Sequence, residues 1–332
     1  MSAATGWLEA SGFVIAIGAL SLVYAIGYRF GAHPIAFILY AILTSAVATL
    51  AITGLGDDAL AIALDPMSWV VGSAIIAVEV LYFLTIAYVS PAHGNLVLRF
   101  AIPIAMAAGW AFLGRRPPAL AIVGTVVVTV ATAYVVAITD PSVRWPMTGV
   151  GVLAGVFLVV RGFAGEFHPW NRAARTVREK LRVTGILLLV TSFLSLVLAA
   201  VAAGAVAVGA LPPLRFLPTA AQMLHVPTIL LGSLVGGAIL ALMNYLNFSA
   251  VVKITTENIT AIMAFSPVTT WLFQEIGVAL GWITVTRPEP RLAAAMAVIV
   301  VGVLVIFRAG RRGGVGLRRP AGRRWADRPL RP

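Results

Sequence analysis

Glu79 is an acidic residue inside a long apolar stretch of the sequence, where charges are rare. It lies near the middle of the run 68–89, so its carboxylate needs a proton, a counter-charge or a wet cavity. Tyr82 follows one helical turn later on the same face. This spacing predicts a site for a proton or for the ammonium group of a substrate, because burial raises the pKa of a carboxyl group. The alternative is a structural hydrogen bond to a neighbouring helix.

Arg99 is a basic residue one turn inside the next apolar run, 95–113. Asn95 precedes it by one turn, and Trp110 falls on roughly the same helical face. A guanidinium group there predicts binding of a substrate carboxylate or phosphate, or neutralisation of Glu79. The alternative is that the side chain extends to the outer lipid headgroups, which its shallow depth makes easy.

Further polar residues recur in apolar runs of the second half. Trp271 and Glu275 lie one turn apart late in the run 258–281, where they predict a gate or binding group, or else an interfacial position. The other polar candidates for the substrate or coupling path are Asn244, Tyr245, Asn247 and Asn258. Hydrogen bonding between helices explains such asparagines equally well. Lys253 and Glu257, four residues apart, predict an exposed ion pair at a turn.

The composition places most of the chain in lipid. Of its 332 residues, 60% are hydrophobic and 11% are charged, with a mean hydropathy of +0.98, whereas soluble domains are about one quarter charged. The net charge of +12 is concentrated in the C-terminal tail, so no nucleic-acid partner is predicted. The chain has no cysteine, no phosphate-binding loop and no metal-ligand spacing among its histidines. We therefore expect no cofactor and no metal site.

Ten runs are long and apolar enough to cross a membrane, or nearly so. They are 12–28, 34–53, 68–89, 95–113, 119–138, 147–163, 183–208, 226–250, 258–281 and 292–307. Basic residues fall mostly in the segments on one side, which are Arg115 and Arg116, Arg161 to Arg182, Lys253 and the tail. By the excess of Lys and Arg in cytoplasmic loops, this predicts both termini in the cytoplasm.

Two hydrophobic hairpins repeat the same landmarks. Aligning Tyr82 with Tyr245 also matches Asn95 with Asn258 and, after one inserted residue, Pro103 with Pro267. Each proline frees a backbone carbonyl within a span, which can break the helix beside a cavity or simply bend it for packing. Because the proline recurs in both halves, we favour a break beside a cavity. A duplicated hairpin of this kind is common in secondary transporters.

The repeat defines the predicted fold, an all-α membrane protein with ten transmembrane helices as two inverted five-helix repeats. We assign 1–164 to the first five-helix repeat and 183–307 to the remainder of the second, whose first span is 147–163. Residues 165–182 form a basic cytoplasmic linker, and 308–332 a disordered, Arg-rich cytoplasmic tail on anionic headgroups. An odd number of spans per repeat inserts the second copy upside down.

Both halves carry a span with a proline, a Leu-Gly turn and a last span with two small residues about two turns apart. In the first half these are Pro103, Leu113-Gly114-Arg115-Arg116, Gly124 and Ala131. In the second they are Pro267, Leu280-Gly281-Trp282, Ala295 and Gly302. This series resembles the drug/metabolite transporter superfamily, and within it the EamA-type ten-span carriers. Arg115 and Trp282 depart from the glutamate of the family's turn. The resemblance implies transport without naming the substrate.

These patterns predict a secondary active transporter, not an enzyme, in the plasma (bacterial inner) membrane. It would move a small metabolite by alternating access, with proton coupling at Glu79 as a hypothesis. The alternatives are a flippase for lipids or lipid-linked sugars on the same scaffold and, less favoured, a membrane-embedded enzyme acting on lipid-linked substrates. A homodimer is left open.

Overall fold

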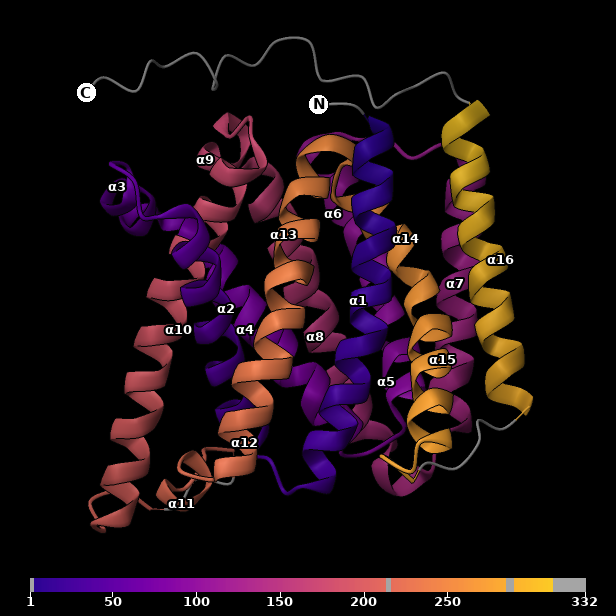
Figure 1. Cartoon of the computed structure of the whole chain (residues 1–332). Helices are drawn as coiled ribbons and strands as arrows, with labels where there is room; N and C mark the ends of the chain where they lie inside the picture. Colours follow the sequence, from indigo (N-terminus) through magenta and orange to yellow (C-terminus); the bar gives the residue numbers. More distant parts are fainter. Residues whose placement is uncertain (1–2, 213–215, 285–289, 313–332) are drawn as a thin grey trace.

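The computed structural model describes residues 3–212, 216–284 and 290–312, and these residues form helices and connecting turns (Figure 1). Nine helical segments within the described part are long and apolar enough to cross a membrane. The chain is therefore an integral membrane protein built of α-helices. Apolar runs of this length form helices because lipid offers the backbone no hydrogen-bond partners.

The long helices of the first half begin at prolines more often than not. Pro34, Pro66 and Pro91 occupy first helical turns, where a missing backbone N–H does no harm. The elements in order are α1 (Ala3–Arg29), α2 (Pro34–Thr53), α3 (Ala59–Leu64), α4 (Pro66–Ile86), α5 (Pro91–Val97), η1 (Leu98–Phe100), α6 (Ala101–Leu113) and α7 (Ala119–Ile138).

The second half has the same number of long segments, with two short helices, α9 and α11, where the first half has one, α3. Its elements are α8 (Pro141–Phe167), α9 (Pro169–Ala173), α10 (Val177–Ala207), α11 (Ala220–Met223), α12 (Val226–Leu230), η2 (Leu231–Gly236), α13 (Gly237–Ile254), α14 (Thr256–Ile262), η3 (Met263–Phe265), α15 (Ser266–Ala279) and α16 (Pro290–Arg312). A π-helical turn, η2, joins α12 to α13, where Gly232 and Gly236 pack closely on Phe37.

Two segments are broken in the same way. A seven-residue helix, α5 or α14, leads into a three-residue 3₁₀ turn, η1 or η3, and then into a longer helix, α6 or α15. Pro103 and Pro267 lie just after these turns, so the breaks fall where the prolines remove helical hydrogen bonds. The sequence correctly placed both breaks.

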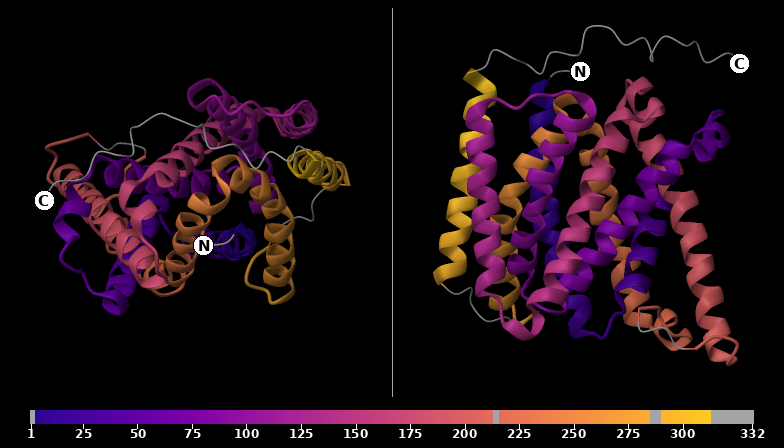
Figure 2. Two further views of the ribbon diagram at one scale, coloured as in Figure 1. Left: turned by 90° about the horizontal axis from the view of Figure 1, so that it is seen from above. Right: turned by 180° about the vertical axis from the view of Figure 1, so that it is seen from behind.

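The two broken segments pack side by side and antiparallel. The first part of one meets the second part of the other, since α5 contacts α15 and α14 contacts α6. Around them, α1 lies between α13 and α15, while α4 packs on α8, α2 on α10 and α7 on α16 (Figures 1 and 2). Gly124 and Gly302 let α7 and α16 approach to backbone contact. The start of α1 and the end of α16 lie at the same end of the bundle, called here the terminal end (Figure 1).

Several boundaries differ from the sequence prediction. The predicted span 258–281 corresponds to the broken segment α14–η3–α15, which is not one of the nine apolar candidates. Much of the expected linker 165–182 is helical, because α8 continues to Phe167 and α10 already begins at Val177. Helix α16 extends to Arg312, into the first residues of the expected tail, and the tail from 313 onward lies outside the described residues.

Candidate functional site

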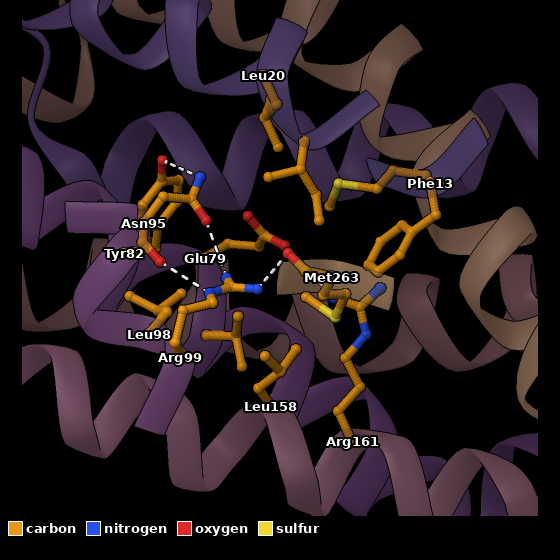
Figure 3. A pocket seen from close by; sticks show the side chains of 13 residues that line it. Phe13, Leu20, Glu79, Tyr82, Asn95, Leu98, Arg99, Leu158, Arg161 and Met263 are labelled. Carbon is orange, nitrogen blue, oxygen red and sulfur yellow. Dashed lines mark hydrogen bonds and ion pairs between the residues drawn. The ribbon is translucent and has the colours of Figure 1, made fainter. Parts of the chain in front are cut away.

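A small cavity lies where the two broken helices meet α1, α4 and α8. Its volume is about 30 Å³, room for about two water molecules at roughly 10–15 Å³ each. Three charged side chains, Glu79, Arg99 and Arg161, line it together with Tyr82 and Asn95 (Figure 3). The rest of its wall is apolar, formed by Phe13, Ile17, Leu20, Val78, Leu98, Leu158, Met243 and Met263. Charges this deep in a membrane bundle point to a functional site.

Glu79 is held by two neighbouring helices. Tyr24 of α1 donates a hydrogen bond of 2.8 Å to its Oε2, and Arg161 of α8 forms an ion pair of 3.5 Å with its Oε1. Glu79 as a whole is only 4% exposed. The structural alternative, a hydrogen bond to a neighbouring helix, is confirmed, and a proton or ammonium site at Glu79 stays a prediction.

Arg161 was missed as a site residue, and its predicted place among the cytoplasmic cations is wrong. It is 3% exposed within α8, which continues for more than a turn beyond it. Its Nη2 donates to Asn244 Oδ1 at 2.9 Å, and its guanidinium lies 5.5 Å from the centroid of the Phe13 ring. The predicted span 147–163 contains Arg161, and the apolar residues on both sides of it were the available signal, but its place near the end of that span led us to count it among the loop cations.

Arg99 links the two helix breaks. It lies in η1, and its Nη1 donates to the Met263 carbonyl in η3. In a regular α-helix that carbonyl would accept from the residue four positions on, which here is Pro267 and has no N–H. Arg99 also donates to the backbone oxygen and to the side-chain oxygen of Asn95, both at 2.9 Å. It is 2% exposed, so the alternative that it extends to the headgroups is wrong.

A network of hydroxyl groups extends from Asn95 across three helices. Asn95 Nδ2 donates to Tyr82 Oη at 2.9 Å and to Thr270 Oγ1 at 2.8 Å, and Ser266 donates to its Oδ1 at 2.7 Å. Tyr82 also lies 2.7 Å from Ser21 Oγ. Hydroxyl groups in sequence gave no signal for this network, since Ser and Thr are common in membrane helices.

The other predicted site residues lie away from the cavity. Trp110 is 54% exposed on the outside of α6. Its predicted face assumed a straight α-helix, whereas η1 turns by about 120° per residue instead of 100°. Asn247 lines a second, smaller cavity near Thr256 and Thr260.

Four residues of the second half that were predicted to line the substrate or coupling path make no polar contact at the cavity. Asn258 donates within its own helix turn to the Ile254 carbonyl. Tyr245 and Glu275 are half-buried and do not line the cavity. The Trp271 ring packs against apolar residues around α7 and α16, with its buried indole N–H unpartnered among the described residues.

A second charged cluster lies at the terminal end of the bundle, beyond the cavity. Arg115 pairs with Glu166 of α8 and, at 2.9 Å, with Glu257 of α14. Lys253 of α13 pairs with Glu9 of α1. The predicted Lys253–Glu257 pair is therefore wrong: tertiary contacts supply each residue with a partner on another segment. Burial lowers the pKa of Arg115, but the two carboxylates outweigh it and raise the pKa overall.

No protein-family model matches the sequence, and no curated protein matches it. The chain is similar to a solved structure described as "Crystal structure of protein", with a TM-score of 0.59 and 19% sequence identity. The likeness covers 94% of this chain and 99% of that chain. At this identity it shows a shared fold over almost the whole length and carries no function.

Proposed function

We propose that the chain is a secondary active transporter that moves a small metabolite across the plasma membrane by alternating access. The observation that carries this proposal is the buried cavity of Glu79, Arg99 and Arg161 at the junction of two broken helices. Carrier sites of this type lie near the bilayer midplane, at discontinuous helices in the interface between repeats. No phosphate-binding loop is present to couple transport to ATP.

Three structural features support two inverted repeats of five spans, including the broken segment α14–α15. The breaks match in length and in their prolines, and the broken segments are antiparallel. The five segments of each half correspond in chain order: α1, α2, α4, α5–α6 and α7 to α8, α10, α12–α13, α14–α15 and α16. Under this correspondence the packed pair α4–α8 becomes the packed pair α13–α1. The pairs α2–α10 and α7–α16 each map onto themselves. Finally, the two ends of the described chain lie at one end of the bundle, as an even number of crossings requires (Figure 1). These features also favour EamA-type membership.

We assign the terminal end to the cytoplasm. Arg115, Arg116 and Lys253 lie at this end, as do Arg172 to Arg182, whereas Arg29 and Arg144 lie at the opposite one. The excess of basic residues marks the cytoplasmic side. Removing Arg161 from the count leaves this excess in place.

Transport is tested in liposomes that contain the purified chain and a lumenal pH dye. A panel of amino acids, sugars, carboxylates and nucleosides is added outside, and uptake and lumenal pH are followed together. We expect one class of solute to enter, with a pH change that Glu79→Gln abolishes. Glu179→Gln, on the exposed start of α10, is the matched control and is expected to transport normally.

The two parts of the proposal fail separately in this assay. If no solute enters through the wild-type chain, the carrier proposal is overturned. If uptake by Glu79→Gln keeps its full pH dependence, proton coupling at Glu79 is overturned while the carrier remains.

A further inference from the structure

The central cavity holds one more positive charge than negative charge. Arg161 is matched by Glu79, but no described carboxylate forms an ion pair with Arg99, whose partners are the Asn95 and Met263 oxygens. A buried cation without a counter-charge is costly in a medium of low dielectric constant. Neutral oxygens offset only part of that cost, so the cavity carries a net field that attracts an anion.

The spare hydrogen-bonding groups around the cavity are donors. A guanidinium has five N–H donors, and Arg99 uses three in the bonds described above. Arg161 Nε and Asn244 Nδ2 are buried and have no partner among the described residues. Meanwhile both oxygens of Glu79 are engaged, by Tyr24 and Arg161. The unpartnered polar atoms named here are therefore donors, and the one carboxylate that lines the cavity already faces a guanidinium group.

We infer that the transported solute is a small organic anion, bound through a carboxylate or phosphate group at Arg99. This inference rests on the proposed carrier function and narrows its substrate class. It replaces the sequence-based alternative of a substrate ammonium group at Glu79, because Arg161 already pairs with that carboxylate. The apolar wall, which includes Phe13, Leu20 and Met243, fits the hydrocarbon body of such an anion. At about 30 Å³ the cavity must widen before it encloses one.

Binding is tested without transport, on the purified full chain in a neutral detergent. Benzoate, butyrate and phenyl phosphate are titrated against thermal unfolding, with benzamide as the neutral isostere of benzoate. We expect at least one anion to raise the Tm in a saturable way, and benzamide not to. Arg99→Gln is expected to weaken the apparent affinity at least tenfold.

Arg144→Gln is the matched control, because Arg144 also donates to backbone carbonyls, those of Ala137 and Thr139, but far from the cavity. It is expected to keep the anion-dependent shift.

Asn95→Asp tests the surplus charge itself and guards against a misfolded Arg99→Gln. The side-chain oxygen of Asn95 already accepts from Arg99 Nη2, so this nearly isosteric change places a carboxylate on the unmatched guanidinium. We expect the variant to unfold at a higher Tm than wild type without added anion and to lose the anion-dependent shift. A lower Tm, or an unchanged response to benzoate, would overturn the inference.

The source of the anion is distinguished with dihexanoyl phosphatidylglycerol and its zwitterionic phosphatidylcholine counterpart. A shift that needs Arg99 and appears only with phosphatidylglycerol supports the anion site and assigns it to a lipid headgroup. No shift with any anion, or equal shifts in Arg99→Gln, overturns the inference. Liposome uptake of a neutral or cationic solute that Arg99→Gln leaves intact overturns the substrate class and keeps the carrier.

Discussion

The two ends of the bundle are held together by different chemistry. At the terminal end, Arg115 joins Glu166 and Glu257, and Lys253 joins Glu9. At the opposite end, no ion pair is found among the described residues. There, Arg29 donates to the Gly281 and Trp282 carbonyls, Tyr28 to the Phe83 carbonyl at 2.9 Å, and His93 contacts Thr139 at 2.9 Å.

If the chain is the carrier proposed above, this difference indicates which interactions must separate when each end opens. Hydrogen bonds to backbone oxygens are worth about 0.5–1.5 kcal/mol each for a neutral donor and about 1.5–3 kcal/mol for a charged one. Those of Arg29 lie in an exposed region, where water readily replaces them. Separating a partly buried ion pair exposes charges whose attraction depends on a low dielectric surrounding and on salt. Contacts at the terminal end therefore depend more on charge than those at the opposite end. Substitutions of charged residues should change stability and access more at the terminal end.

The largest effect is expected from Arg115→Gln. It leaves Glu166 and Glu257 close together without their shared cation, and their side chains are only 9% and 16% exposed. We expect a loss of about 2 kcal/mol in unfolding free energy, less than for a fully buried pair because some solvent reaches the site. Since the chain has no cysteine, Thr260→Cys beside the second cavity gives a clean reporter. Its maleimide labelling should be several-fold faster when Arg115 is replaced.

The neighbouring Arg116 provides the control for that substitution. It is exposed, so Arg116→Gln should leave both the Tm and the labelling rate at wild-type values. Labelling of Thr260→Cys that is equally slow with and without Arg115 would show that the ion pairs do not close this end.

An intermediate effect is expected from acid, through His168 at the terminal end. Burial lowers the pKa of His168 to about 4 from 6.5, opposed in part by Asp65. Because the folded-state pKa is depressed, the stability contribution of the neutral ring is complete above pH 6.5. It is lost as the pH falls towards 4. The Tm of the wild type should fall over this range, and His168→Gln should flatten the curve. Parallel curves of Tm against pH for the wild type and His168→Gln would show that His168 does not cause the loss of stability in acid.

The smallest effect is expected at the opposite end, from Arg29→Gln. The substitution removes the two bonds to the Gly281 and Trp282 carbonyls, which lie in an exposed region. We expect a loss of at most about 1 kcal/mol and an unchanged labelling rate for Thr260→Cys. Faster labelling of Thr260→Cys in the Arg29→Gln variant would mean that the contacts at the two ends depend on each other.

Local pattern predicted the helices and their breaks, because the length of an apolar run and the position of a proline act within a few residues. It also found Glu79, Tyr82, Asn95 and Arg99, which the structure brings together at the cavity. Their partners depend on packing between distant segments, and no spacing in the sequence records it.

Arg161 and Trp110 show where prediction from local sequence pattern failed. Arg161 is buried because α8 continues past the point where apolarity declines, since a charged residue matched by Glu79 no longer needs to leave the membrane. Trp110 is exposed on α6, on the far side of a 3₁₀ turn, so a face projected from Arg99 along one regular helix does not place it. Both errors come from extrapolating a single isolated helix.

Pro267 has no N–H to donate to the Met263 carbonyl oxygen, and Arg99, from the other half of the chain, donates to that oxygen instead. An oxyanion that draws the guanidinium towards itself must compete with this oxygen. Occupancy of the site and this bond between the two half-chains are then coupled, so filling the site would weaken one of the contacts that join the two broken segments.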